Sequence, residues 1–158
     1  MDQPRHLASP SEENIERLRR IVHLLIRSFL VSGRAGPPAE GQLPFNPLYF
    51  HMLGHLREHG ATRPSQLANV LDVAKTTLST ASSALQKRGL VEKQKDPDDG
   101  RAHLLALTDN GASVADAIYR QDLINMELLL QQLDQEDHEG MLTQLEKIVS
   151  GISSGVEG

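Results

Sequence analysis

The sequence contains no cysteine and no tryptophan, and aromatic residues make up only 3% of its 158 residues. The absence of cysteine excludes disulfides, thiolate zinc sites, iron–sulfur clusters and cysteine-based catalysis or redox sensing. Scarce aromatic residues argue against proteins that bind single-stranded nucleic acid by stacking bases on aromatic side chains. If the partner is a nucleic acid, a duplex fits this composition better.

The chain also lacks long apolar runs and recognisable catalytic motifs. No apolar stretch approaches the roughly 20 residues that span a bilayer, and the N-terminus has no signal-peptide pattern. We therefore expect a cytoplasmic protein with no membrane partner. The sequence shows no G-x-S-x-G, no phosphate-binding loop and no paired acid in a plausible cleft. Hence we expect neither an enzyme nor a bound cofactor.

The net charge of -5 argues against a protein that coats nucleic acid indiscriminately, so the local distribution of positive charge decides whether the chain binds DNA. A loose arm is expected over residues 1–10. Ser9 and Pro10 form a cap-and-proline start for an amphipathic helix that runs to about Val31. A glycine- and proline-rich loop over residues 33–44 follows, and a second helix begins at Asn46 and ends at Gly60.

The central part of the chain has a faster succession of short elements. Helices are predicted from about Pro64 to Leu71 and from Lys75 to about Arg88. Two apolar runs, Leu90 to Glu92 and His103 to Leu107, flank a DPDDG segment with turn chemistry. The pattern indicates helix, turn, helix and then a hairpin.

Two further helices are predicted toward the C-terminus. Thr108 is a cap for the first, and Asp134, with Asp137 three residues later, begins the second. The tail from Ser150 is expected to fray. The first and last helices carry more apolar residues than a small domain could cover, which predicts dimerisation.

The sequence thus predicts a mainly α fold with a small β-hairpin wing, a winged helix-turn-helix whose N- and C-terminal helices form a dimerisation region. Its expected divisions are a flexible arm over 1–10, dimerisation helices over 11–45 and 109–152, a DNA-binding domain over 46–108 and a tail over 153–158.

A helix-turn-helix places its second helix in the major groove of DNA, which requires a small, hydrogen-bonding outer face. Leu78, Ala81 and Leu85 are predicted to point inward. The candidate DNA-binding residues of this helix are Lys75, Thr76, Thr77, Ser79, Thr80 and Ser83. The alternative is a merely solvated helix, but serine and threonine are mediocre helix formers, which favours another use for them.

The hairpin carries basic residues on both sides of its turn. These additional candidate DNA-binding residues are Lys93, Lys95, Arg101 and His103. An arginine near the tip of a hairpin is suited to an adjacent minor groove, where negative potential is enhanced. The nearby acids Asp96, Asp98 and Asp99 oppose this interpretation, unless the turn uses them for Asx-type bonds and for an ion pair that orients Arg101. A charged, solvent-facing hairpin is the alternative.

The stretch NVLDVAKTTLSTASSALQKRGLVEKQKDPDDGRAHLLALTDNG resembles the helix-turn-helix, wing and following helix start of the MarR family. The matching features are the leucine, valine and threonine spacing of the recognition helix, the RGLV ending, the D-P-x-D-x-R wing and the LT-x-x-G helix opening. Weaker agreement extends over the whole chain. Two positions depart from the family pattern, namely Ala74 in place of a capping serine and Gly100 in place of a second wing arginine.

This resemblance implies a homodimer whose first and last helices interlock and whose winged domains bind consecutive major grooves of a pseudo-palindromic duplex. Bound over a promoter, such a dimer would block polymerase, so we expect a repressor. The residues that match DNA-contacting positions are Lys75, Thr76, Thr77, Ser79, Thr80 and Arg101. The resemblance further implies a small aromatic or anionic effector in a crevice between the dimerisation helices and the winged domain. Its candidate lining residues are His23, Arg27, Phe45, Tyr49 and His51, for which ordinary packing or exposure is the alternative.

His51, His55 and His59 recur every four residues, which stacks them on one face of a helix. Histidines at this spacing are able to ligate zinc or nickel, so a metal-responsive regulator of the same fold is a second interpretation. No H-E-x-x-H pattern supports it, and three surface histidines are the simpler explanation. A winged-helix module that binds protein rather than DNA is a third interpretation.

Overall fold

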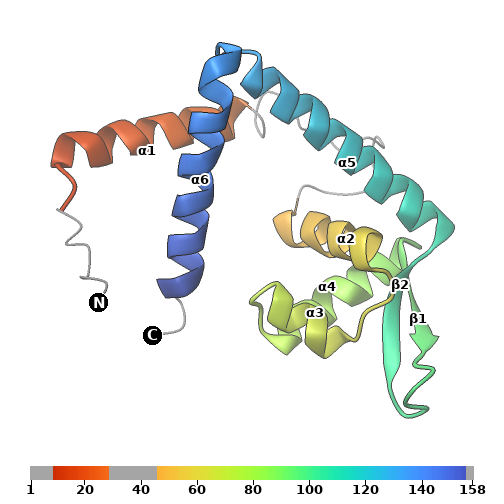
Figure 1. The fold of residues 1–158 in the computed structure, drawn as a ribbon. Coiled ribbons are helices and arrows are strands. Elements are labelled where there is room, and N and C mark those ends of the chain that lie inside the picture. The colour runs from red at the N-terminus through yellow and green to blue at the C-terminus, as the bar shows by residue number, and fades with distance from the viewer. Residues whose placement is uncertain (1–8, 29–45, 156–158) are drawn as a thin grey trace.

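The computed structural model describes residues 9–28 and 46–155. The helices and strands in this part of the chain are α1 (Glu12–Ile26), α2 (Pro47–His59), α3 (Pro64–Val70), α4 (Lys75–Lys87), β1 (Val91–Lys95), β2 (His103–Leu107), α5 (Asp109–Leu130) and α6 (Gln135–Gly155). Helices α2 to α4 and the hairpin form one body, from which α5 leads away to α6 (Figure 1). The predicted fold class, mainly helical with a small hairpin wing, is confirmed.

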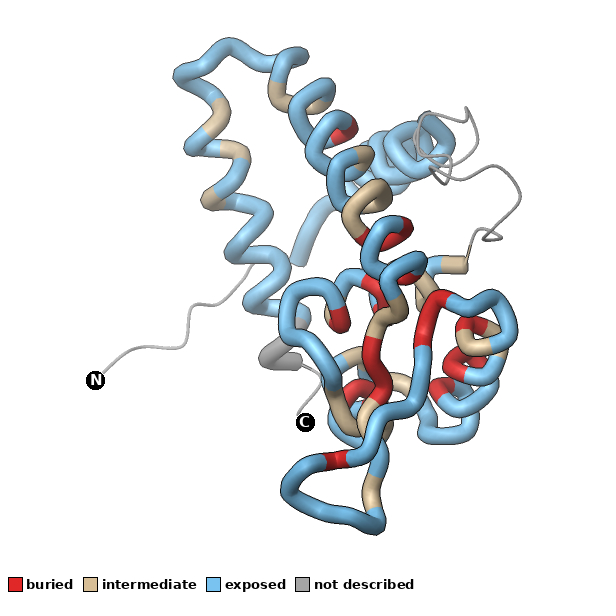
Figure 2. Tube along the Cα trace, turned by 90° about the vertical axis from the view of Figure 1, so that its right-hand side faces the viewer, coloured by how far each residue is buried: buried red, intermediate tan, exposed pale blue. Residues whose placement is uncertain are grey.

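The hydrophobic core lies in the winged domain. Leu78 and Leu85, which were predicted to point inward from the recognition helix, are buried, as is Ala81. The core residues come from α2, α3, α4, both strands and the start of α5, and comprise Met52, Leu53, Leu56, Leu67, Ala68, Leu78, Ala81, Leu85, Leu90, Val91, Leu105, Val114 and Ala115. Figure 2 shows burial concentrated in this body, whereas the distant helices are largely exposed. The winged domain is therefore a rigid platform for the surface of α4.

The wing is an antiparallel hairpin in which Val91 pairs with Leu107 at the root and Lys95 with His103 at the outer end. Pairing continues up to the turn, so β1 runs through Lys95 and is longer than the predicted strand, which ended at Glu92. An isolated bridge joins Thr62 to Leu105, with hydrogen bonds of 2.9 Å in both directions. The segment before α3 therefore pairs through one residue with the middle of β2.

The start of α5 packs tightly against Gly89 and Leu90, which follow α4. Thr108 caps the helix as predicted, since its hydroxyl oxygen accepts from the Gly111 N–H at 3.0 Å. The same hydroxyl donates to the Gly89 carbonyl at 2.6 Å, and the Thr108 N–H donates to the Leu90 carbonyl at 3.1 Å. A Cβ at position 111 would overlap the Leu90 carbonyl oxygen, so this contact requires glycine.

Two predicted helix boundaries are wrong. Helix α1 begins at Glu12 with Ser11 as its cap, not with Ser9 and Pro10, because the Ser11 hydroxyl oxygen accepts from the Asn14 N–H at 3.2 Å. Helix α6 continues past Ser150 to Gly155, where fraying was expected. The predicted helix end near Val31 and the loop over residues 33–44 lie outside the described part of the chain.

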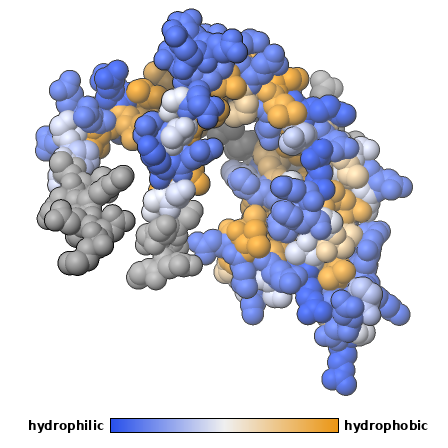
Figure 3. Space-filling view, in the orientation of Figure 1, coloured by the Kyte–Doolittle hydropathy of each residue, from blue (hydrophilic) through white to orange (hydrophobic). Residues whose placement is uncertain are grey.

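The helices outside the winged domain expose a large apolar surface. In Figure 3, hydrophobic residues appear on these helices away from the wing. Exposed apolar side chains on α1 and α6 include Ile15, Leu18, Val22, Leu25, Leu142, Leu145, Ile148 and Ile152. No helix within residues 9–28 and 46–155 is long and apolar enough to cross a membrane.

Candidate nucleic-acid interface

The outer face of α4 presents small polar side chains to solvent. All six candidates are exposed on it, namely Lys75, Thr76, Thr77, Ser79, Thr80 and Ser83. The Thr80 hydroxyl donates to the Thr76 carbonyl at 3.0 Å, so it is partly committed to its own helix. Ala74 at the N-cap makes no side-chain hydrogen bond, which leaves the first-turn N–H groups of α4 without a side-chain cap. No side-chain cap therefore offsets the partial positive charge at this end of the helix.

Side chains of the hairpin alternate between its two faces, which places its basic and acidic strand residues on opposite sides. Cross-strand partners share a face, so Lys93, Lys95 and His103 lie on the same side as Leu105. Glu92 lies on the opposite side, where its carboxylate accepts from the Gln94 amide at 2.9 Å. The hairpin thus turns its basic residues toward α4 and its acidic residue away.

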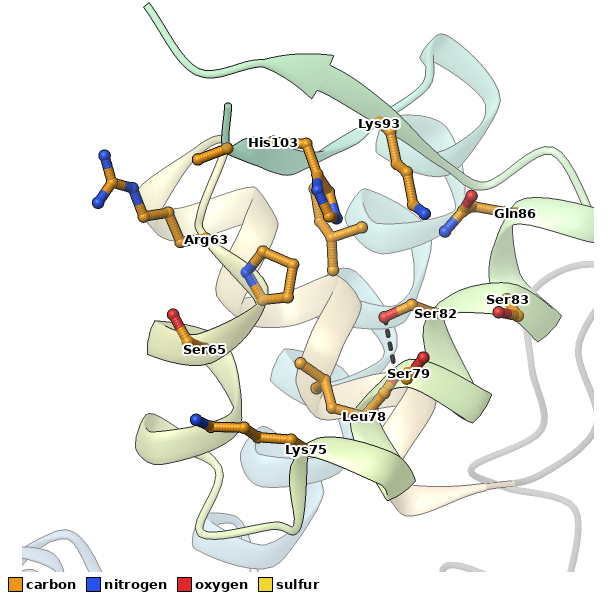
Figure 4. Close-up of a pocket in the computed structure, with 13 residues that line it drawn as sticks. Arg63, Ser65, Lys75, Leu78, Ser79, Ser82, Ser83, Gln86, Lys93 and His103 are labelled. Carbon is orange, nitrogen blue, oxygen red and sulfur yellow. Dashed lines mark hydrogen bonds between the residues drawn. The ribbon is translucent and has the colours of Figure 1, made fainter. Parts of the chain in front are cut away.

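A hollow of about 430 Å³ lies between the start of α3, the outer side of α4 and the basic face of the hairpin. Lys93 and His103 extend into it from the hairpin, and Gln86 faces them from α4 (Figure 4). Ser82 lies deeper, with its hydroxyl bound to the Leu78 carbonyl at 2.8 Å. The hollow has the positive and hydrogen-bonding groups that suit a phosphate backbone.

Four polar residues that line this hollow were not predicted from the sequence, and they are Arg63, Ser65, Ser82 and Gln86. Arg63 and Ser65 flank Pro64, the first residue of α3. The sequence pattern predicted only that this proline starts a helix. Gln86 lies on the same side of α4 as Ser79 and Ser83, about two helical turns after the first and one turn after the second. Extending that face by helical periodicity from Ser79 and Ser83 would have found Gln86, but only tertiary packing brings in Arg63.

The wing turn uses its acids internally, as predicted in part. The Asp96 carboxylate accepts from the Asp98 N–H at 2.9 Å, and the Asp99 carboxylate accepts from the Arg101 N–H at 3.0 Å. The predicted ion pair that would orient Arg101 is wrong, because Asp96 pairs with Arg63 Nε at 2.6 Å instead. The hydrogen bond to Arg63 holds the pKa of Asp96 below its ordinary value.

Arg101 lies near the end of the turn and is exposed. Its guanidinium makes no hydrogen bond or ion pair with any residue in the described ranges, in contrast to Arg63. An unpaired guanidinium at the tip of a projecting hairpin is available to an outside partner.

A second cleft, of about 510 Å³, lies between α2 and α5, and His51 lines it together with Phe50, His55, Tyr119 and Asp122. Arg57 closes one side of this cleft, bound to Asp116 at 2.6 Å and placed 4.0 Å from the centre of the Tyr119 ring. Burial raises the pKa of Asp122, against the opposing effect of His51.

The structure does not bring all five predicted ligand residues to this cleft. His51 lines it, whereas Tyr49 is half-buried against the core. His23 and Arg27 are exposed at the end of α1, where His23 lines a separate shallow groove. Phe45 lies outside the described residues.

The predicted histidine row gives no metal centre. The His55 and His59 rings lie 4.4 Å apart, and burial together with His59 lowers the pKa of His55. No three histidine, aspartate or glutamate side chains of the described segments are grouped to hold a metal ion. The structure therefore offers nothing in favour of a metal-responsive regulator.

Comparison with known proteins identifies several relatives. The family model described as MarR family matches residues 45–103. The chain is 24% identical over 144 residues to the uncharacterized HTH-type transcriptional regulator YkoM of Bacillus subtilis, a match that covers 91% of this chain and 92% of YkoM. It is 32% identical over 71 residues to the HTH-type transcriptional repressor NicR of Pseudomonas putida, which covers 45% of each protein.

Solved structures share the architecture at low sequence identity. Streptococcus pneumoniae FabT in complex with DNA matches with a TM-score of 0.78 and 18% identity, over 89% of this chain and 98% of FabT. A MarR family protein from Bacillus stearothermophilus matches with a TM-score of 0.71 and 17% identity, over 92% of this chain and 99% of that protein. These likenesses extend beyond the winged domain to the outer helices.

Proposed function

Since the chain belongs to the MarR family of DNA-binding transcription regulators, we propose that it is a homodimeric repressor that binds a pseudo-palindromic operator. The observation that carries this proposal is the placement of the hydroxyl-rich face of α4 beside the basic face of the hairpin. Lys75, Ser79 and Ser83 of that face line one hollow together with Lys93 and His103 of the hairpin. A duplex docked there would meet hydrogen-bonding groups and positive charge together.

In the proposed complex, α4 lies in the major groove and Thr77 and Ser79 contact base edges. The phosphate strand beside that groove passes the hollow, where Lys93, Gln86 and His103 face it. Arg101, unpaired in the described structure, reaches the adjacent minor groove. The remaining candidates Lys75, Thr76, Thr80, Ser83 and Lys95 support these contacts from the same surface.

The exposed apolar stripes of α1 and α6 support a dimer. Side chains such as Leu18, Val22, Leu145 and Ile148 lie on helices that make few contacts with the winged domain. A stripe of this size remains in water only at a considerable free-energy cost unless a second chain covers it. A two-fold dimer would place its recognition helices on half-sites about one helical turn, ~34 Å, apart.

The proposed effector site is the cleft between α2 and α5, because α2 belongs to the winged domain and α5 leads to the dimerising helices. A small aromatic or anionic molecule there would change the angle between them and so the spacing of the two recognition helices. A related structure is that of Staphylococcus aureus MepR bound to ethidium bromide.

We also propose a cytoplasmic location, because a regulator that binds promoter DNA must be in the same compartment as that DNA.

The test is selection of bound sequences from a random duplex library, followed by fluorescence anisotropy of the enriched site at two salt concentrations. A pseudo-palindrome whose affinity falls steeply with salt is expected. Arg101→Ala should weaken binding and lessen the salt dependence, whereas Arg120→Ala on α5 removes the same charge away from the interface. Absence of both enrichment and non-specific duplex binding would refute the regulator and favour a protein-interaction module.

A further inference from the structure

Asp96 is an acidic residue that the protein keeps away from water at the point where the wing turn begins. Only 5% of its surface is exposed. A buried carboxylate is costly unless it is paired and hydrogen-bonded. Here one oxygen accepts from Arg63 Nε at 2.6 Å and the other from the Asp98 N–H at 2.9 Å. Both oxygens are therefore engaged, one outside the wing and one within it.

Arg63 belongs to a different part of the fold, at the N-cap of α3. Its neighbour Thr62 is bonded through the backbone to Leu105, the middle residue of β2. Its side chain holds Asp96, just beyond the outermost strand pair of Lys95 and His103. The segment before α3 thus contacts the hairpin at two points. The inner contact is the backbone bridge to Leu105, and the outer contact is the Arg63–Asp96 ion pair.

The turn beyond Asp96 is a small unit with its own internal bonds. The Ala102 N–H donates to the Asp99 carbonyl at 2.9 Å, and the Arg101 N–H donates to the Asp99 carboxylate at 3.0 Å. An isolated two-stranded hairpin has little stability of its own, so its outer end depends on contacts with the body of the domain. The direction in which Arg101 points is therefore set where the turn is attached.

We propose that the Arg63–Asp96 ion pair fixes the wing turn on the winged domain and so positions Arg101 for DNA. Arg63 is a positioning residue in this arrangement, since its Nε is occupied by Asp96. Both groups are ionised at neutral pH, and the hydrogen bond between them lowers the pKa of Asp96 and raises that of Arg63, so it favours the ionised pair further. The inference rests on the proposed contact of Arg101 with DNA.

The inference reverses the sign that charge alone predicts. Removing an acid close to DNA reduces repulsion and should strengthen binding. Asp98→Asn does this in the same turn, because the Asp98 carboxylate is exposed and accepts no hydrogen bond from a described residue. Asp96→Asn removes the same charge but also weakens the interaction with Arg63. The two variants therefore have matched charge and opposite expected effects.

The experiment measures duplex affinity by fluorescence anisotropy for the unaltered protein, Asp96→Asn and Asp98→Asn, each with and without Arg101→Ala. We expect Asp96→Asn to weaken binding by about tenfold, the order of one lost charge-assisted contact. Asp98→Asn should bind as tightly as the unaltered protein or more tightly. Arg101→Ala should matter much less in the Asp96→Asn protein than in the other two.

The ratio of affinities with and without Arg101 is taken within one background, so a partly unfolded Asp96→Asn preparation does not alter it. Equal affinities for Asp96→Asn and Asp98→Asn, or an undiminished Arg101 ratio in Asp96→Asn, would overturn the inference alone. If Arg101→Ala has no effect in the unaltered protein, the proposed wing contact fails and the inference fails with it. If the unaltered protein binds no duplex, the proposed function itself fails.

Discussion

Replacing Gly111 by alanine perturbs the contact between the start of α5 and Leu90, which follows α4. Gly111 is buried in the first turn of α5, and a Cβ there would overlap the Leu90 carbonyl oxygen. That carbonyl is backbone and also accepts from the Thr108 N–H at 3.1 Å, so it cannot turn aside as a flexible side chain would. The substitution must therefore move α5 away from Leu90 or break the cap.

The magnitude follows from opposing contributions. Overpacking against rigid neighbours costs about 1–3 kcal/mol, and the upper part of that range applies because the obstacle is backbone. A weakened Thr108–Leu90 hydrogen bond adds about 1 kcal/mol. Alanine gains up to about 1 kcal/mol over glycine in a helix. The free energy of unfolding should therefore fall by about 2–3 kcal/mol.

The assay is urea denaturation followed by circular dichroism, at one protein concentration because a dimer's stability depends on concentration. Gly54→Ala is the matched control, since Gly54 lies within α2 and a Cβ there meets nothing within 4 Å. It should raise the free energy of unfolding by up to about 1 kcal/mol. A Gly111→Ala protein as stable as the Gly54→Ala protein would refute the reasoning about the Leu90 contact.

Leu78→Ala should lower the free energy of unfolding by about 2–5 kcal/mol, measured by urea denaturation, because Leu78 is fully buried on the inner side of α4. Thr77→Ala and Ser79→Ala should leave stability nearly unchanged but relax base preference by about 1–3 kcal/mol at particular positions, measured on single-base operator variants; uniform loss on all duplexes would indicate phosphate contacts instead. The lowered pKa of Asp96 implies that its pairing stabilises the fold above the ordinary aspartate range. Stability should fall as pH drops below about 4, and less steeply in Asp96→Asn; equal acid sensitivity would contradict this.

Helical periodicity and turn chemistry were enough to predict the order of elements in the winged domain. The burial of Leu78 and Leu85 and the cap at Thr108 followed from local patterns, because both depend on spacing within one segment. Boundaries were less accurate. The strand β1 extends to Lys95 because its partner strand continues opposite it, which charged residues in the sequence concealed.

The candidate interface was predicted in its outline. The six polar residues of α4 and the basic residues of the hairpin are indeed exposed, although only DNA-binding measurements test their roles. The hollow between them was not predicted, since it depends on how the hairpin folds back beside α4. Arg63 was missed for the same reason, because 33 residues separate it from Asp96.

Local sequence patterns were sufficient to predict the helix-turn-helix, the turn of the wing and the polar face of α4. These features arise from interactions between residues a few positions apart, so composition and spacing specify them. The pairing of Asp96 with Arg63, the side of the hairpin that faces α4 and the need for glycine at position 111 became visible only in the folded chain. Each of these depends on the distance between backbone segments that are remote in sequence, and only packing sets that distance.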